Sequence, residues 1–276
     1  MKIGIFDSGV GGLIVAKAIR QKMPKYDYVY LGDTKRVPYG NRSHKTVFGF
    51  TREGVDYLFR KENCIIVIVA CNTASARALR KMQQEYLPKN FLIMRGEKNQ
   101  RKILGVLIPA AEEASKYKRI GVLATTGTVV SKTFVKEKNK INPKANVFQN
   151  HAPMLVPLIE AGDFGLATEF IKKYLKAFEN KKLDVLVLGC THYPILKNQI
   201  KKEIKKLTLK DIKIISQDEI IPKKLKEYFV QHPEIEKKIS RKGTVKILVT
   251  DMTENVAKLS SGWFGKVKPK VITLSR

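Results

Sequence analysis

The chain has 276 residues, of which 43% are hydrophobic and 28% charged, and its formal net charge is +28 at pH 7. This length predicts one large or two modest domains with a proper hydrophobic core. The three cysteines show no paired spacing, and no Cys–Cys or His–Cys spacing matches a metal site, so we expect no disulfide framework, no bound metal and a reducing, cytosolic compartment. The chain opens directly on a strand pattern instead of a signal peptide, and no apolar run reaches the roughly 18 residues of a membrane span.

The excess of positive charge is mostly lysine, which supplies 41 of the 53 basic residues. Nucleic-acid recognition favours arginine for its bidentate contacts, and it gathers charge in a patch or stripe. Here the lysines are spread along the chain, and the densest stretch, 197–213, alternates them with isoleucine and leucine as a solvated helix face does. We therefore expect no nucleic-acid partner and no membrane, although the positive field would attract small dicarboxylate anions.

Apolar runs and helical patterns alternate along the chain. Strands are predicted at 2–6, 28–33, 64–70, 103–108, 119–124, 146–149, 185–189, 213–216 and 245–250. Helices are predicted at 13–23, 43–62, 74–85, from about 109, and at 163–180, 197–207, 220–229 and 254–263. The tail from 266 is expected to be loosely held. Such alternation predicts parallel sheets that are covered by helices on both faces.

Two cysteines follow predicted buried strands at matching positions, Cys71 after the strand at 64–70 and Cys190 after the strand at 185–189. In open α/β sheets, ligands bind at the carboxyl ends of the strands. Each cysteine is followed by polar residues, Asn72 and Thr73 in one case and Thr191 and His192 in the other. Cysteines at strand ends are often plain core residues, but these polar groups need partners that a packed core does not offer. We interpret the two motifs as halves of one site.

Two such cysteines facing one ligand suit acid–base chemistry. One thiolate can remove a proton from a tetrahedral carbon while the other thiol delivers a proton to the opposite face, which inverts a stereocentre. A thiol with its ordinary pKa of about 8.5 is only slightly ionised at pH 7, so each sulfur needs help. A helix N-terminus lowers the pKa of a thiol, and Asp7 and His192 are candidates to orient or shuttle the proton.

A glycine-rich turn at 7–12 (Asp-Ser-Gly-Val-Gly-Gly) follows the first predicted strand. Its backbone N–H groups at a helix start suit an anion such as a carboxylate or phosphate, yet it is neither a Walker loop nor a GxGxxG fingerprint. Asp7 would repel an anion unless it meets a cation or a proton in transit, and a plain helix cap is the alternative. The segment 37–40 (Val-Pro-Tyr-Gly) presents a phenol in a fixed turn, which an ordinary structural turn also explains.

These segments together resemble the signature segments of glutamate racemase, a family of the aspartate/glutamate racemase superfamily. The resemblance is carried, in the family's order, by 7–12, 37–40, 70–74 (Ala-Cys-Asn-Thr-Ala) and 189–194 (Gly-Cys-Thr-His-Tyr-Pro), and it covers the chain to about Gly265. It implies a cofactor-independent isomerase that interconverts L- and D-glutamate with two bases. D-glutamate is used for bacterial peptidoglycan, and so for cell wall biogenesis and cell shape.

The resemblance also implies roles for single residues. Cys71 and Cys190 are the proton-transfer pair, Asp7 assists Cys71, and His192, supported by Glu160, assists Cys190. The residues implied to hold the substrate's carboxylates and ammonium group are Asp7, Ser8, Tyr39, Gly40, Asn72, Thr73, Thr125, Thr191 and His192. Neither a cofactor nor a metal is implied.

The expected fold class is α/β, with two doubly wound parallel-sheet lobes related by a pseudo-two-fold axis and the active site between them. The first lobe is expected to comprise 1–97 and 211–276, and the second 98–210. The polar stretch 95–102 is interpreted as an insertion near the crossing. A homodimer in the bacterial cytoplasm, with glutamate as its small-molecule substrate, completes the expectation. The alternatives are a racemase for aspartate or another small acid, and a basic nucleic-acid-binding protein on the same scaffold.

Overall fold

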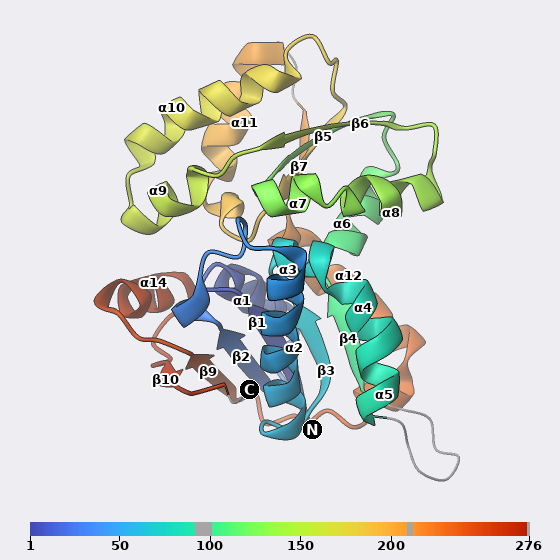
Figure 1. Ribbon diagram of the computed structural model, residues 1–276, viewed down its shortest axis with the longest axis vertical. Helices are drawn as coiled ribbons and strands as arrows, with labels where there is room; N and C mark the ends of the chain where they lie inside the picture. The colour runs from blue at the N-terminus through green and yellow to red at the C-terminus, as the bar shows by residue number, and fades with distance from the viewer. Residues whose placement is uncertain (92–100, 209–211, 275–276) are drawn as a thin grey trace.

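In a computed structural model, which describes residues 1–91, 101–208 and 212–274, the chain forms two parallel β-sheets stacked along the long axis of the molecule (Figure 1). The first sheet has the strand order β10-β9-β2-β1-β3-β4. Its strands are β1 (Lys2–Asp7), β2 (Tyr28–Gly32), β3 (Cys64–Val69), β4 (Lys102–Gly105), β9 (Val245–Val249) and β10 (Lys270–Val271). The second sheet has the order β6-β5-β7-β8. Its strands are β5 (Arg119–Ala124), β6 (Asn146–His151), β7 (Val185–Gly189) and β8 (Lys213–Ile215).

Helices fill the connections between these strands. The α-helices are α1 (Gly12–Lys22), α2 (His44–Arg60), α3 (Asn72–Arg77), α4 (Leu79–Lys81), α5 (Leu87–Phe91), α6 (Leu107–Ala114), α7 (Thr126–Val130), α8 (Thr133–Ile141), α9 (Leu155–Ala161), α10 (Phe164–Leu175), α11 (Lys197–Thr208), α12 (Gln217–Gln231), α13 (Pro233–Glu236) and α14 (Glu254–Phe264). Short 3₁₀ segments lie at Thr34–Arg36, Lys176–Phe178 and Tyr193–Leu196, and a π-helical turn at Met82–Tyr86. Among the described helices, none is long and apolar enough to cross a bilayer.

The first sheet is covered on both faces. One hydrophobic core packs it against α1, α12 and α14, which contribute Leu13, Ile221 and Phe264. A second core packs the other face against α2 and the helical segment after β3, with Leu58 and Leu79 as buried members. Burial on both faces explains why β3 is a continuous β-branched run instead of an alternating one.

The second sheet also has a core on each face. Ile171 of α10 and Ile200 of α11 belong to one core, and Leu107 of α6 and Phe134 of α8 to the other. Both sheets are therefore wound by helices on two sides, and the predicted α/β class with two doubly wound lobes is confirmed.

The two lobes repeat one strand order. Strands β2-β1-β3-β4 of the first sheet correspond in sequence to β6-β5-β7-β8 of the second, and every pairing in both sheets is parallel. Strands β3 and β7 are the third strands of their halves, and Cys71 and Cys190 lie just beyond them. The order reverses between the first and third strands of each half, which is the switch point where α/β sheets bind ligands.

The predicted lobe boundaries leave β4 outside the first lobe and β8 outside the second, although each strand belongs to the sheet of that lobe. Strand β4 pairs with β3 in the first sheet, and β8 pairs with β7 in the second. Val106 belongs to a core of the first lobe and Leu107 to a core of the second, while the chain returns between Ile215 and Ile221. We propose a division that follows these cores, with 1–106 and 216 onward in one lobe and 107–215 in the other.

Three predicted elements differ from the structure. The strand at 103–108 ends at Gly105, because the apolar run continues into α6 and a short apolar run does not distinguish a strand from a buried helix. The helix at 74–85 is interrupted after Arg77 and passes through the π-helical turn. The tail is not loose throughout, since β10 adds a parallel edge strand to β9. The interpreted insertion at 95–102 lies mostly outside the described residues.

Gly189 lets β7 approach β5 directly before Cys190. A Cβ atom added there would lie 2.7 Å from Cβ of Ala124 and 3.3 Å from the carbonyl oxygen of Leu123. We expect Gly189→Ala to destabilise the protein by about 1–3 kcal/mol through overpacking. Gly262→Ala is the control, because nothing lies within 4 Å of that position in α14. Urea unfolding of both variants checks this, and equal stabilities would contradict it.

Candidate active site

A cavity of about 390 Å³ lies between the two lobes. Ser8 and Cys71 line it from the first lobe, and Thr125 and Cys190 from the second. Every predicted site residue except Asp7 belongs to its lining. A larger groove of about 570 Å³ lies on the first lobe beside α2 and is lined by surface side chains such as Arg60 and Lys81, without either cysteine of the site.

Cys71 stands at the start of α3 and caps that helix. Its Sγ accepts a hydrogen bond from the N–H of Ala74 at 3.5 Å. Burial and the negative charge of Asp7 nevertheless raise the pKa of the Cys71 thiol to about 12, against the opposing effects of the Ser8 hydroxyl and the Ala74 N–H. The helix start does act to lower this pKa, through the Ala74 N–H, but desolvation outweighs it and the net shift is upward.

Asp7 lies behind the cavity at the end of β1 and is fully buried. Its Oδ2 accepts hydrogen bonds from the N–H groups of Gly9 and Gly12, both at 3.1 Å. Its Oδ1 has no hydrogen-bond partner among the described residues. Burial raises the pKa of Asp7, although His192 and the backbone N–H groups oppose this. The glycine-rich turn thus binds its own aspartate with the N–H groups that were expected to face an anion.

The Cys190 side is built differently, around His192. Nδ1 of His192 lies 3.8 Å from Sγ of Cys190, and Nε2 lies 2.8 Å from Oε1 of Glu160 in α9. Burial would lower the pKa of His192, but the contacts with Cys190 and Glu160 raise it to about 10. The ring is therefore an imidazolium at neutral pH, held between a sulfur and a carboxylate. The predicted contact between Glu160 and His192 is present.

The first lobe packs directly on this histidine. A Cβ atom at Gly11 would lie 2.4 Å from Cε1 of His192, so only glycine leaves room for the ring. The indole of Trp263 in α14 meets the ring edge-on, with centroids 5.5 Å apart. Neither residue is among the predicted site residues, and the one signal for Gly11 was its place in the glycine-rich turn. His192 thus belongs to one lobe and is positioned by both.

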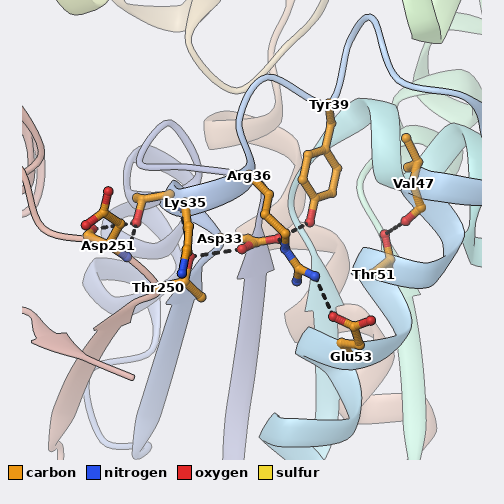
Figure 2. Close-up of polar contacts among 10 residues, drawn as sticks. Asp33, Lys35, Arg36, Tyr39, Val47, Thr51, Glu53, Thr250 and Asp251 are labelled. Atoms are coloured by element: carbon orange, nitrogen blue, oxygen red, sulfur yellow. Dashed lines mark hydrogen bonds and ion pairs between the residues drawn. The ribbon is translucent and has the colours of Figure 1, made fainter. Parts of the chain in front are cut away.

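Tyr39 lines the cavity, and its hydroxyl points toward Asp33 (Figure 2). The hydroxyl donates to Oδ2 of Asp33 at 2.5 Å, and the same oxygen accepts from Nε of Arg36 at 2.6 Å. Oδ1 of Asp33 accepts from the hydroxyl of Thr250 at 2.9 Å, and Arg36 also forms an ion pair with Glu53. The phenol therefore anchors the loop to the first lobe, and its expected role in holding the substrate stays a prediction.

The lobes meet along one side of the cavity. The hydroxyls of Thr73 and Thr125 are 2.9 Å apart. Nε of Arg77 donates to the carbonyl of Gly127 at 3.2 Å. Farther out, the guanidinium of Arg80 binds both carboxylate oxygens of Glu137, at 3.0 and 2.7 Å. These contacts hold α3 and α4 against α7 and α8, and so hold the two cysteine-bearing halves together.

The cavity contains little fixed positive charge. Among the described residues that line it, none is lysine or arginine. Hydroxyls, the Asn72 amide, backbone N–H groups and the His192 imidazolium remain as donors. The lining residues that were not predicted are mostly apolar: Gly9, Val37, Pro38, Asn41, Thr126, Pro153, Met154, Val156 and Pro157. Gly9, Val37 and Pro38 lie in the motif segments 7–12 and 37–40, and the others carry no sequence signal that separates them from ordinary loop residues. Within the described chain, no group of three or more His, Cys, Asp or Glu side chains could hold a metal ion.

Comparisons with known proteins agree with this geometry. Residues 14–217 match the model of the Asp/Glu/hydantoin racemase family. The chain is 38% identical over its full length to a glutamate racemase from Sulfurihydrogenibium sp., covering 98% of that protein. Its fold matches the glutamate racemase structure from Aquifex pyrophilus, with a TM-score of 0.75, 37% identity and 98% of each chain covered. It also matches the Francisella tularensis glutamate racemase in complex with D-glutamate, with a TM-score of 0.86, 27% identity, and 99% of this chain and 97% of that chain covered.

The fold and the site define an isomerase of the amino-acid racemase class. The chain belongs to the Asp/Glu/hydantoin racemase family, and its expected resemblance to the glutamate racemases is confirmed.

Tyr39→Phe separates an anchoring phenol from a substrate-binding one. We expect the loss of the hydrogen bond to Asp33 to lower stability by about 1 kcal/mol. We also expect KM for glutamate to stay within about twofold of the wild-type value. If the substrate makes no contact with the hydroxyl, removing the hydroxyl costs no binding energy. Thermal unfolding and steady-state kinetics check both parts. An unchanged melting temperature with a large rise in KM would show that the phenol binds substrate.

Proposed function

We propose that the protein is a glutamate racemase that interconverts L- and D-glutamate with Cys71 and Cys190 as its two acid–base groups, and without a cofactor. The observation that carries the proposal is the single cavity that both cysteines line from opposite lobes. Family membership supports racemisation, and the relative whose solved structure holds D-glutamate supports glutamate as the substrate.

In this proposal, donors other than lysine and arginine hold the substrate's carboxylates. Ser8, Thr73, Thr125 and Thr191 offer hydroxyls around the cavity, and Asn72 offers an amide. At the turn after Tyr39, the main chain of Gly40 lines the cavity and can contribute its N–H. The His192 imidazolium adds positive charge on the Cys190 side, and Asp7 places negative charge behind Cys71, so the site has a polarity that orients a zwitterion.

The proton transfer needs one sulfur as a thiolate and the other as a thiol. In one direction, Cys190 acts as a thiolate beside His192, removes the α-proton and becomes a thiol. The Cys71 thiol then delivers its proton to the opposite face of the carbon and becomes a thiolate. One C–H bond breaks on one face and one forms on the other, so the stereocentre inverts with no change of oxidation state. The opposite enantiomer uses the same two groups in reverse order.

The two sides differ in how they prepare their sulfur. Cys71 is held as a thiol by burial and by Asp7, whereas Cys190 contacts an imidazolium. The surroundings of Cys71 therefore suit the step in which Cys71 donates a proton, because an acid–base group is most effective when its protonation state matches its task.

Replacing either cysteine tests the two-base mechanism. We expect Cys71→Ala and Cys190→Ala each to lower kcat for racemisation by at least about 100-fold, because each removes one general acid or base. Circular dichroism of D-glutamate incubated with each variant measures the rate. Cys64→Ala is the control, since Cys64 is buried in β3 away from the cavity. Unreduced activity in either site variant would rule out the mechanism, and a panel with aspartate tests the substrate.

Glu160→Gln tests the origin of the His192 charge. The carboxylate helps to raise the pKa of His192, so we expect the variant to move the alkaline limb of kcat/KM to lower pH. The stability that the imidazolium contributes is fully present below its unfolded pKa of 6.5 and is lost as the pH rises toward about 10. The melting temperature of the wild type should therefore fall more steeply between these pH values than that of the variant. Parallel pH profiles in both proteins would contradict this.

The physiological setting is part of the same proposal. D-glutamate made in the bacterial cytoplasm would supply peptidoglycan synthesis, and the active form would be a homodimer, as the resemblance implies. All three cysteines are free and buried, which fits a reducing compartment. Growth of a D-glutamate auxotroph that expresses the chain tests the role, and light scattering tests the oligomer. Failure to restore growth by a protein that is active in vitro would overturn the role alone.

A further inference from the structure

Gln217 lies where the chain crosses from the second lobe to the first, and it contacts a residue of the active site. It begins α12, two residues after the last strand of the second sheet ends at Ile215. The residue is fully buried, and its Nε2 donates a hydrogen bond to Oδ1 of Asn72 at 3.1 Å. Asn72 directly follows Cys71 and lines the cavity. A side chain outside the cavity lining therefore binds the neighbour of a proposed acid–base group.

Each of these two side-chain amides has one polar group that the hydrogen bond between them does not use. Nδ2 of Asn72 and Oε1 of Gln217 are both buried, and among the described residues neither has a hydrogen-bond partner. Buried polar groups are nearly always paired in folded proteins. Because Asn72 lines the cavity, a ligand there can supply the acceptor that its NH₂ group lacks. A carboxylate is such an acceptor, because an ionised carboxylate has no hydrogen to donate.

We propose that Gln217 is a positioning residue, which holds the Asn72 carboxamide with its oxygen engaged and its NH₂ group available to a carboxylate of the substrate. The two ends of a carboxamide have nearly the same shape, so packing alone does not choose between them. In the structure, Nε2 of Gln217 donates to Oδ1 of Asn72, and this pairing leaves the Asn72 NH₂ group without a protein partner among the described residues. The inference rests on the proposed racemase function and adds a residue to it.

Two substitutions at this position separate the possible roles. Gln217→Met keeps the length of the side chain but removes the donor, so the Asn72 amide is no longer oriented. Gln217→Glu supplies only acceptors once its carboxyl is ionised, so at a pH where it is charged Asn72 turns its NH₂ group toward residue 217 and presents its oxygen to the ligand. Gln231→Met at the exposed end of the same helix is the matched control.

We expect KM for glutamate to rise about tenfold in Gln217→Met, because the hydrogen bond from the Asn72 NH₂ group to a charged carboxylate is lost. We expect a larger rise in Gln217→Glu, because Asn72 then presents an acceptor to that carboxylate. We expect kcat to change less than KM, because Asn72 binds the substrate and does not transfer its proton. Gln231→Met should keep wild-type kinetics. If Gln217→Glu does not fold, Gln217→Met still decides the question, because its side chain is uncharged and of matching length.

A double-mutant cycle shows whether Gln217 acts through Asn72. In an Asn72→Ala background, Gln217→Met should have no further effect on KM or on the affinity for D-glutamate measured by calorimetry. Equal effects in both backgrounds, or a lowered melting temperature with unchanged KM, would show a purely structural role and overturn the inference alone. A wild-type protein that neither binds nor racemises glutamate would instead overturn the proposed function, and the inference with it.

Discussion

The two contacts of His192, with Cys190 and with Glu160, decide the charge of its ring. The Cys190 sulfur at 3.8 Å and the Glu160 carboxylate at 2.8 Å together raise the pKa of the buried imidazole to about 10, although burial alone would lower it. On the other side of the cavity, Asp7 and burial keep Cys71 protonated. One cavity therefore contains a sulfur beside a positive charge and a sulfur beside a negative charge. In the proposed mechanism, two identical side chains acquire opposite tasks from their surroundings.

This difference depends on how closely the lobes approach one another. Gly11 of the first lobe leaves just enough room for the His192 ring, and Trp263 meets the ring from the same lobe. The paired hydroxyls of Thr73 and Thr125 close the seam beside the cavity. Cys190 and His192 come from the second lobe, but their geometry is set by contacts from the first. A movement of one lobe would therefore change the site on both sides at once.

The repeated strand order explains why so much of the site was predictable. Buried parallel strands leave clear β-branched runs, and the residue after each run lies at the ligand-binding edge, so Cys71 and Cys190 could be placed from their positions alone. The other predicted site residues then followed from the resemblance, and every one except Asp7 lines the cavity. Asp7 is adjacent to it, buried by the turn that it organises.

The parts that could not be predicted depend on contacts distant in the sequence. The hydroxyl of Tyr39 is bound by Asp33, and nothing in the local pattern distinguishes an anchored phenol from a free one. The raised pKa of Cys71 reflects burial, whereas the local pattern shows only a helix start. Gln217 lies 145 residues from its partner Asn72, and Trp263 reaches His192 from the last helix. The proposed lobe boundaries differ from the expected ones because an edge strand, β4 or β8, completes each sheet before the chain crosses to the other lobe.

The central claim is that two groups on opposite faces of the α-carbon transfer the proton. The most direct test follows the early reaction of one glutamate enantiomer in deuterated water by NMR and mass spectrometry. The two-cysteine account predicts that deuterium enters the α-position of the product enantiomer while the recovered substrate keeps its protium. Equal early labelling of substrate and product would indicate a single base that serves both faces, and racemisation without any deuterium uptake would contradict the account altogether.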